Sequence, residues 1–198
     1  MGLASFICLA RAPRHYFVCS FLRAVTQADL LAQLTQRHQH FAEHMMAAEK
    51  PRVVGVSSSW TPGQQLDHIR RSVAPLAQVL RLPKPLLRLL FGRANRPSRP
   101  YAEVVARYQT RLAGGGRASG RYLPAAAATA KAQKQATAAA LREAVRQLTQ
   151  RAGTYSEPEL DAYVLPHPLL GKLTLREMLC FTLYHVEHHH KQVAPDLT

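Results

Sequence analysis

The stretch TLREMLCFTLYHVEHHHKQV, from Thr174 to Val193, combines a helical pattern with four histidines. Thr174 and Glu177 fit a capping box, in which each side chain satisfies a backbone N–H of the other at the start of a helix. We therefore predict an amphipathic helix over 174–193. Apolar residues recur at close to the helical period of 3.6 at Leu175, Met178, Leu179, Thr182, Val186 and Val193.

Two histidines of this helix have the spacing of metal ligands. His185 and His189 are four residues apart, so they lie on one face, one turn from each other. Two imidazoles at this spacing can bind the same ion. His188 is a second choice, and His190 points away from His185. The spacing alone equally fits the solvated end of a surface helix, so a metal site requires a third ligand from another segment.

Three further segments, 26–49, 61–81 and 126–151, have helical patterns, and the second begins with the capping box Thr61–Gln64. Four amphipathic helices predict an all-α fold, a four-helix bundle, whose core can hold a metal site. The core-facing stripe of the first helix contains Leu31, Leu34, His38, Phe41, Met45 and Ala48.

The second helix offers the third histidine. His68 lies on the flank of its apolar stripe, and the polar or small neighbours Gln64 and Ser72 leave room for an ion. Pro75 lacks a backbone donor, so we expect it to kink or end this helix. His38 of the first helix faces the interior. A hydrogen-bonded core histidine is the commoner role there, and we keep His38 as a candidate wall of the site.

The connection 82–123 is strongly basic. With Arg81 it holds ten arginines and lysines against one acid, Glu103, which is nine of the net +14 charges of the chain. Prolines and the run Gly114-Gly-Gly116 interrupt it. We expect a solvated, mobile basic excursion outside the bundle core, in preference to a nucleic-acid surface, because no nucleic-acid motif accompanies the charge. We also expect 153–172 to be a loop.

Composition indicates a single domain. The 198 residues are 47% hydrophobic, enough for one core, which we place at 26–198 after a poorly specified N-terminal extension, 1–25. There is no apolar run of about 18 residues, so we expect no membrane span. The three cysteines show no metal or redox spacing, which favours a reducing, cytoplasmic location. A homodimer is left open.

Two motifs resemble signatures of the DinB-like superfamily: WTPGQQLDH at 60–68, and HPLLGKLT at 167–174 followed by YHVEHH at 184–189. The resemblance covers about 26–81 and 125–193. It implies a four-helix bundle whose metal is held by one histidine of the second helix and two of the last. The implied ligands are His68, His185 and His189. The long basic excursion and Pro75 depart from the family pattern.

The resemblance also implies a chemistry. The family includes thiol-dependent transferases, an isomerase that uses a small thiol, and proteins described as metal-dependent hydrolases. We therefore expect a divalent ion to activate water or a thiol, acting on a small-molecule substrate that could be a low-molecular-weight thiol. Zinc suits three imidazoles plus water best, and nickel or iron also fit.

The catalytic residues stay unknown at this stage. Asp67 and Glu187 point away from the implied site, which leaves no carboxylate general base. Gln64 and His188 could support the ligands from behind. The alternative function is a non-enzymatic binding protein for nucleic acid or another anionic partner, using 82–123.

Overall fold

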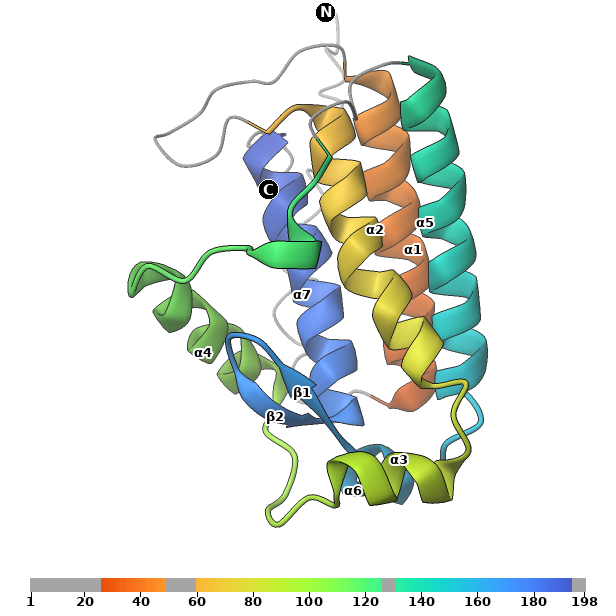
Figure 1. Ribbon diagram of the computed structural model, residues 1–198, viewed down its shortest axis with the longest axis vertical. Helices are drawn as coiled ribbons and strands as arrows, with labels where there is room; N and C mark the ends of the chain where they lie inside the picture. The colour runs from red at the N-terminus through yellow and green to blue at the C-terminus, as the bar shows by residue number, and fades with distance from the viewer. Residues whose placement is uncertain (1–25, 49–59, 126–130, 194–198) are drawn as a thin grey trace, which may run out of the picture.

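The computed structural model describes residues 26–48, 60–125 and 131–193. The predicted N-terminal extension, 1–25, lies outside these residues. Four long helices form a bundle (Figure 1): α1 (Gln27–Ala47), α2 (Pro62–Val79), α5 (Lys131–Ala152) and α7 (Leu175–Val193). The predicted all-α four-helix bundle is confirmed, and helix ends agree with the predicted ones to within two residues wherever the residues are described. No helix in the described part is long and apolar enough to cross a membrane.

The direction of the helices explains the long connection between the second and third. In Figure 1, α1 and α7 run one way along the bundle, and α2 and α5 run the other way. Since α2 and α5 contact each other while running in the same direction, the chain must return along the whole bundle between them. The segment 82–123 lies in this return crossing.

Two helices begin at the capping boxes that the sequence predicts. The capping box of Thr61 and Gln64 is present, as is that of Thr174 and Glu177. Of the two effects expected of Pro75, a kink or an end of the helix, the second does not occur, because α2 continues to Val79. The residues after the proline hold the last turn through their burial, which offsets one missing backbone hydrogen bond. They are Leu76, Ala77 and Leu80.

The prediction of a solvated basic loop at 82–123 is also wrong. The segment forms α3 (Lys84–Phe91), α4 (Tyr101–Ala113) and a short 3-10 helix, η2 (Gly120–Tyr122). Leu87, Val104 and Tyr108 are buried in the common core, and α4 packs against α7. The apolar positions of the two helices repeat at helical spacing, and this burial outweighs the high charge of the segment.

A buried carboxylate ties the basic segment to the bundle. Glu177 of α7 is fully buried and accepts two hydrogen bonds from the guanidinium of Arg96, at 2.6 and 2.8 Å. The backbone N–H of Arg99 donates to the same carboxylate at 2.7 Å, and the N–H of Thr174 at 3.0 Å. Part of the positive charge of the segment is therefore neutralised inside the fold.

The predicted loop at 153–172 contains regular structure. It forms α6 (Glu157–Ala162) and the strands β1 (Val164–His167) and β2 (Gly171–Thr174), which pair antiparallel with His167 opposite Gly171. Gly171 has a φ of +74°, a conformation that favours glycine and closes the turn. Prolines in and after the first strand hid the hairpin from the sequence pattern. The hairpin brings His167 to the side of α7.

Candidate metal centre

Three buried histidines converge between α2 and α7. His185 Nε2 lies 3.2 Å from His68 Nε2 and 3.1 Å from His189 Nε2. His68 is in the first half of α2, and the other two are in the second half of α7. The antiparallel directions of these helices bring the three to one level. The three residues have ligand atoms within 4.8 Å of one another, so they could hold a metal ion.

The distances from His185 Nε2 to the other two nitrogens fit a zinc-sized ion. Two nitrogens at tetrahedral angles, each bound at 2.0–2.1 Å, would be about 3.3 Å apart. The two Nε2–Nε2 distances of 3.2 and 3.1 Å are close to this value. Three imidazoles also leave an open coordination position, which is the arrangement of catalytic zinc sites and not of closed structural ones.

Two hydrogen bonds fix the tautomers of two of the three candidate ligands, His68 and His189. His68 Nδ1–H donates to the carbonyl oxygen of Tyr122 at 2.7 Å, and His189 Nδ1–H donates to Oε1 of Gln65 at 2.6 Å. With the proton on Nδ1, each ring directs the lone pair of Nε2 at His185. A cation satisfies lone pairs that face one another in this way, and such partners behind the ligands are typical of metal sites.

The carbonyl of Tyr122 is held in place by α2 itself. Asp67, next to His68, accepts a hydrogen bond from the backbone N–H of Ala125 at 2.8 Å, and Arg71 donates to the carbonyl oxygen of Arg121 at 3.3 Å. Asp67 also pairs with Arg70 and Arg71. Its role is thus to fix the segment after α4 against α2, which positions the acceptor for His68.

The three imidazoles are neutral around pH 7. Burial, and then the neighbouring imidazoles, lower the pKa of His185 and His189 well below 6.5. Burial also lowers the pKa of His68, although its bond to the Tyr122 carbonyl opposes the shift. A neutral imidazole is the form that binds a metal.

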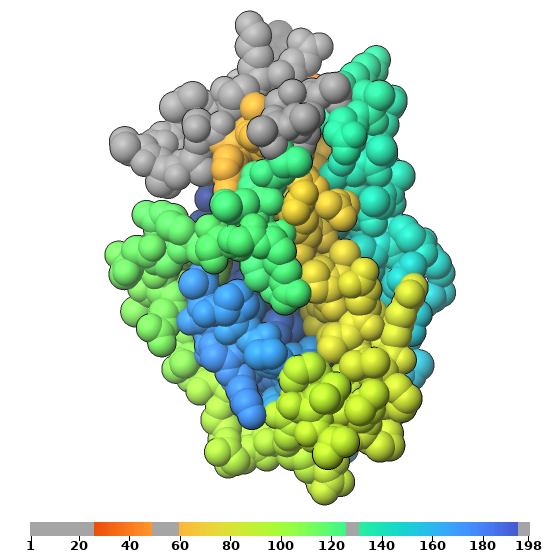
Figure 2. Space-filling model, viewed as in Figure 1, coloured from red at the N-terminus to blue at the C-terminus, as the bar shows by residue number. Residues whose placement is uncertain are grey.

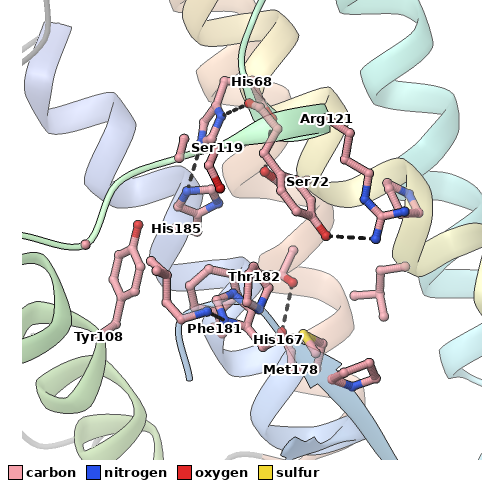
Figure 3. A pocket seen from close by; sticks show the side chains of 18 of the residues that line it. His68, Ser72, Tyr108, Ser119, Arg121, His167, Met178, Phe181, Thr182 and His185 are labelled. Atoms are coloured by element: carbon pink, nitrogen blue, oxygen red, sulfur yellow. Dashed lines mark hydrogen bonds between the residues drawn. The ribbon is translucent and has the colours of Figure 1, made fainter. Parts of the chain in front are cut away.

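A cavity of about 1370 Å³ opens beside the three histidines. Figure 2 shows a hollow between α2, the segment around η2 and the β1–β2 hairpin. Figure 3 shows His68 and His185 on the wall of the cavity together with Tyr108 and Phe181. Most of the lining surface is apolar. The described lining residues include Arg117 and Arg121 and contain no aspartate or glutamate.

His167 gives the cavity a fixed hydrogen-bond donor. Its Nδ1 accepts from the backbone N–H groups of Leu169 at 3.2 Å and Leu170 at 3.1 Å. The proton of the neutral ring is therefore on Nε2. Burial lowers the pKa of His167 to about 4, so the ring stays neutral at pH 7. The ring contacts Phe181, which stacks on His185.

The remaining candidates from the sequence, His188, Gln64 and His38, lie in three different environments. His188 lines the cavity and hydrogen-bonds Gln192. Gln64 caps α2, and its neighbour Gln65 is the glutamine that hydrogen-bonds His189. His38 is buried in the core, where its Nδ1 bonds the carbonyl oxygen of Leu34, and it does not line the cavity.

Sequence reasoning missed several groups that surround the centre. The helical phase could have identified Gln65, which is three residues before His68 and on the same face. Trp60 stacks on His189, and Tyr108 meets His185 edge-on. No sequence signal connects the Tyr122 carbonyl with His68, because any residue can offer a carbonyl.

We predict that Gln65→Ala weakens zinc binding by about 10–100-fold, the usual effect of removing a hydrogen bond behind a histidine ligand. The ring of His189 would lose the acceptor that fixes its tautomer. A competition titration with a chromophoric chelator would measure the change. Gln64→Ala is the matched control and should leave zinc affinity unchanged, since Gln64 serves only the helix cap. Equal weakening in both variants would contradict the role of Gln65.

The comparisons with known proteins agree with this geometry. The family model described as the DinB superfamily matches residues 20–193. Searches of the curated proteins and of the solved structures found no match. The family match spans both helices that carry the three histidines, and the bundle and the histidine cluster are those that the resemblance implied. The chain belongs to the DinB superfamily.

Proposed function

We propose that this protein is a metal-dependent enzyme, a hydrolase or a thiol (S-)transferase. The observation that carries the proposal is the convergence of three histidine Nε2 atoms at the wall of a large cavity. His68, His185 and His189 would hold the ion, which we expect to be zinc, with nickel and iron as alternatives. A bound divalent ion lowers the pKa of a coordinated water or thiol, which supplies a nucleophile near neutral pH.

The cavity favours reactions that need no carboxylate base. None of the described lining residues is an aspartate or glutamate, and Glu187, which the sequence places away from the site, pairs with Arg37. His188 is the group we propose to accept a proton, because it lines the cavity and burial keeps its pKa below 6.5. Its Nε2 would take the proton in place of the hydrogen bond that the Gln192 amide donates to it. His167 Nε2–H is available to hold an oxygen atom of the substrate.

The lining also suggests the kind of substrate. The wall is mainly apolar, and its only formal charges among the described residues are Arg117 and Arg121. Within the described part of the chain, neither guanidinium pairs with a carboxylate; Arg117 donates to backbone carbonyls and Arg121 to the Tyr122 hydroxyl. A small molecule with an apolar body and an anionic group, such as a thiol that carries a carboxylate, complements this surface.

The nucleic-acid alternative receives less support from the structure. Arg96 and Arg99 are bound to the buried Glu177, and Lys84 pairs with Glu159. These three cations of the basic segment stabilise the fold and are not free to neutralise phosphates. An observation in its favour would be protein–DNA binding with a steep salt dependence.

The proposal can be tested by the hydrolysis of 4-nitrophenyl esters. Esters that carry a carboxylate would be compared with esters that lack one, and each would be assayed with and without cysteine. We expect turnover by the zinc-loaded protein, loss of turnover with a chelator, and no recovery by zinc in His185→Ala. A requirement for cysteine would identify a transferase. Arg121→Gln should raise KM for the carboxylate ester only. Turnover that persists without metal would refute the metal-dependent mechanism.

A further inference from the structure

Helix α3 exposes a cluster of leucines. Among the described residues, four large hydrophobic side chains are exposed, and three of them belong to this helix: Leu86 at 36%, Leu89 at 81% and Leu90 at 57%. Their spacing of three and four places them on one face. The opposite side of α3 is anchored in the core by Leu87, which is 2% exposed. The helix therefore has a second apolar face that the described fold does not cover.

Cations border this face. Arg88 precedes Leu89 by one residue, which places it about 100° around the helix at the edge of the leucine face, and Arg93 follows the helix; both are exposed. Within the described part of the chain, neither side chain pairs with a carboxylate. Lys172 of β2 reaches the end of α3, where its ammonium donates to the carbonyl oxygen of Phe91 at 3.1 Å. The surface thus combines exposed leucines with positive charge, and we call it the α3 face: Leu86, Arg88, Leu89, Leu90 and Arg93.

We propose that the α3 face docks the protein reversibly on an anionic phospholipid bilayer. A short amphipathic helix can lie in the interface, with its leucines at the acyl boundary and its arginines at the phosphates. Figure 2 shows the segment around α3, in yellow-green, at the lower end of the molecule, where a flat surface can approach it.

Two other partners fit the α3 face less well. A two-fold contact with a second copy would bring the Arg88 and Arg93 side chains of both copies together without an acid to separate them. A nucleic acid would satisfy the arginines and leave the leucines in water, where exposed apolar surface is unfavourable. An anionic bilayer can accommodate the leucines at the acyl boundary and the arginines at the phosphates.

The position of the α3 face also relates it to the cavity. Leu82 lies just before α3 and Phe91 is its last residue, and both line the cavity. A protein docked through α3 would hold one wall of the cavity at the membrane surface. The docking itself does not depend on the proposed enzyme activity, so vesicle binding tests it separately.

The test is flotation of the full chain with phosphatidylcholine vesicles that contain or lack phosphatidylserine. We expect binding to the anionic vesicles that weakens as salt is added. Leu89→Gln and Leu90→Gln should each weaken it by about tenfold, since each removes one inserted leucine. Arg88→Gln should weaken binding and flatten its salt dependence. Circular dichroism should be unchanged, because all three side chains are already exposed.

Leu123→Gln is the matched control. Leu123 is also an exposed leucine, at 47%, but lies outside α3, so its loss should not change vesicle binding. Equal binding by wild type and Leu89→Gln, or no binding to anionic vesicles, would refute the proposal. A dimer that dissociates in Leu89→Gln would instead assign the face to self-association, and DNA binding lost in Arg88→Gln would assign it to nucleic acid.

Discussion

His185→Ala is expected to weaken zinc binding by more than the roughly 100-fold that the loss of a supporting hydrogen bond can produce. His185 is central to the cluster, because its Nε2 lies 3.2 Å from Nε2 of His68 and 3.1 Å from Nε2 of His189. His68→Ala and His189→Ala are also expected to weaken zinc binding. Metal analysis of purified, untagged protein would show loss of a stoichiometric ion in each variant.

Thermal unfolding gives a second measure of the same site. An ion that binds only the folded state stabilises it by about 2.7 kcal/mol at a free concentration 100 times Kd. The Tm of the wild type should therefore rise with zinc, and that of His185→Ala should not.

The control for these variants is His44→Ala. His44 lies beside His190 on the other side of α7 and does not line the cavity. It should leave both metal content and the zinc-dependent Tm unchanged, as should His40→Ala. One equivalent of metal retained in the triple variant of His68, His185 and His189 would place the site elsewhere, and the proposed enzyme would lose its basis.

The proximity of His185 and His189 could be predicted from helical spacing, but the position of His68 beside them could not. His185 and His189 share a face in any α-helix, whereas bringing His68 to their level depends on the directions of α2 and α7. The family resemblance carried that step. Gln64 was predicted behind the histidines, but Gln65 is the residue that hydrogen-bonds His189. The helical phase distinguishes the two, since a difference of one residue turns a side chain by about 100°.

The basic segment shows where composition misleads. Counting charges within 82–123 finds one acid, which predicts a solvated loop. The acids that neutralise it lie elsewhere: Glu177 in α7 accepts from Arg96 and Arg99, and Glu159 in α6 accepts from Lys84. Such pairs join residues more than 70 positions apart, so a local count of charge cannot detect them.

Glu177→Gln should lower the free energy of unfolding at pH 7 by about 3 kcal/mol, the lower end of what breaking a buried ion pair costs. The amide cannot accept all the hydrogen bonds of the carboxylate, and it leaves the partly buried Arg96 cation without its ion-pair partner, whereas Arg99 keeps Glu103. Urea unfolding would measure the change. Glu143→Gln removes a carboxylate of the exposed pair with Arg146 and should have no measurable effect.

The difference between wild type and Glu177→Gln should also depend on pH. Burial raises the pKa of this carboxyl, but the hydrogen bonds from Arg96 and from the N–H groups of Arg99 and Thr174 outweigh burial and lower it below 4.5. A lowered pKa means that the carboxylate stabilises the fold fully above about pH 4.5, and that this contribution is lost as pH falls through the folded-state value. The difference in unfolding free energy should therefore be constant from pH 7 to about 5 and shrink below that. A difference that grew on acidification would show that Glu177 is protonated in the fold, in which case it could not hold the basic segment against α7 through charge.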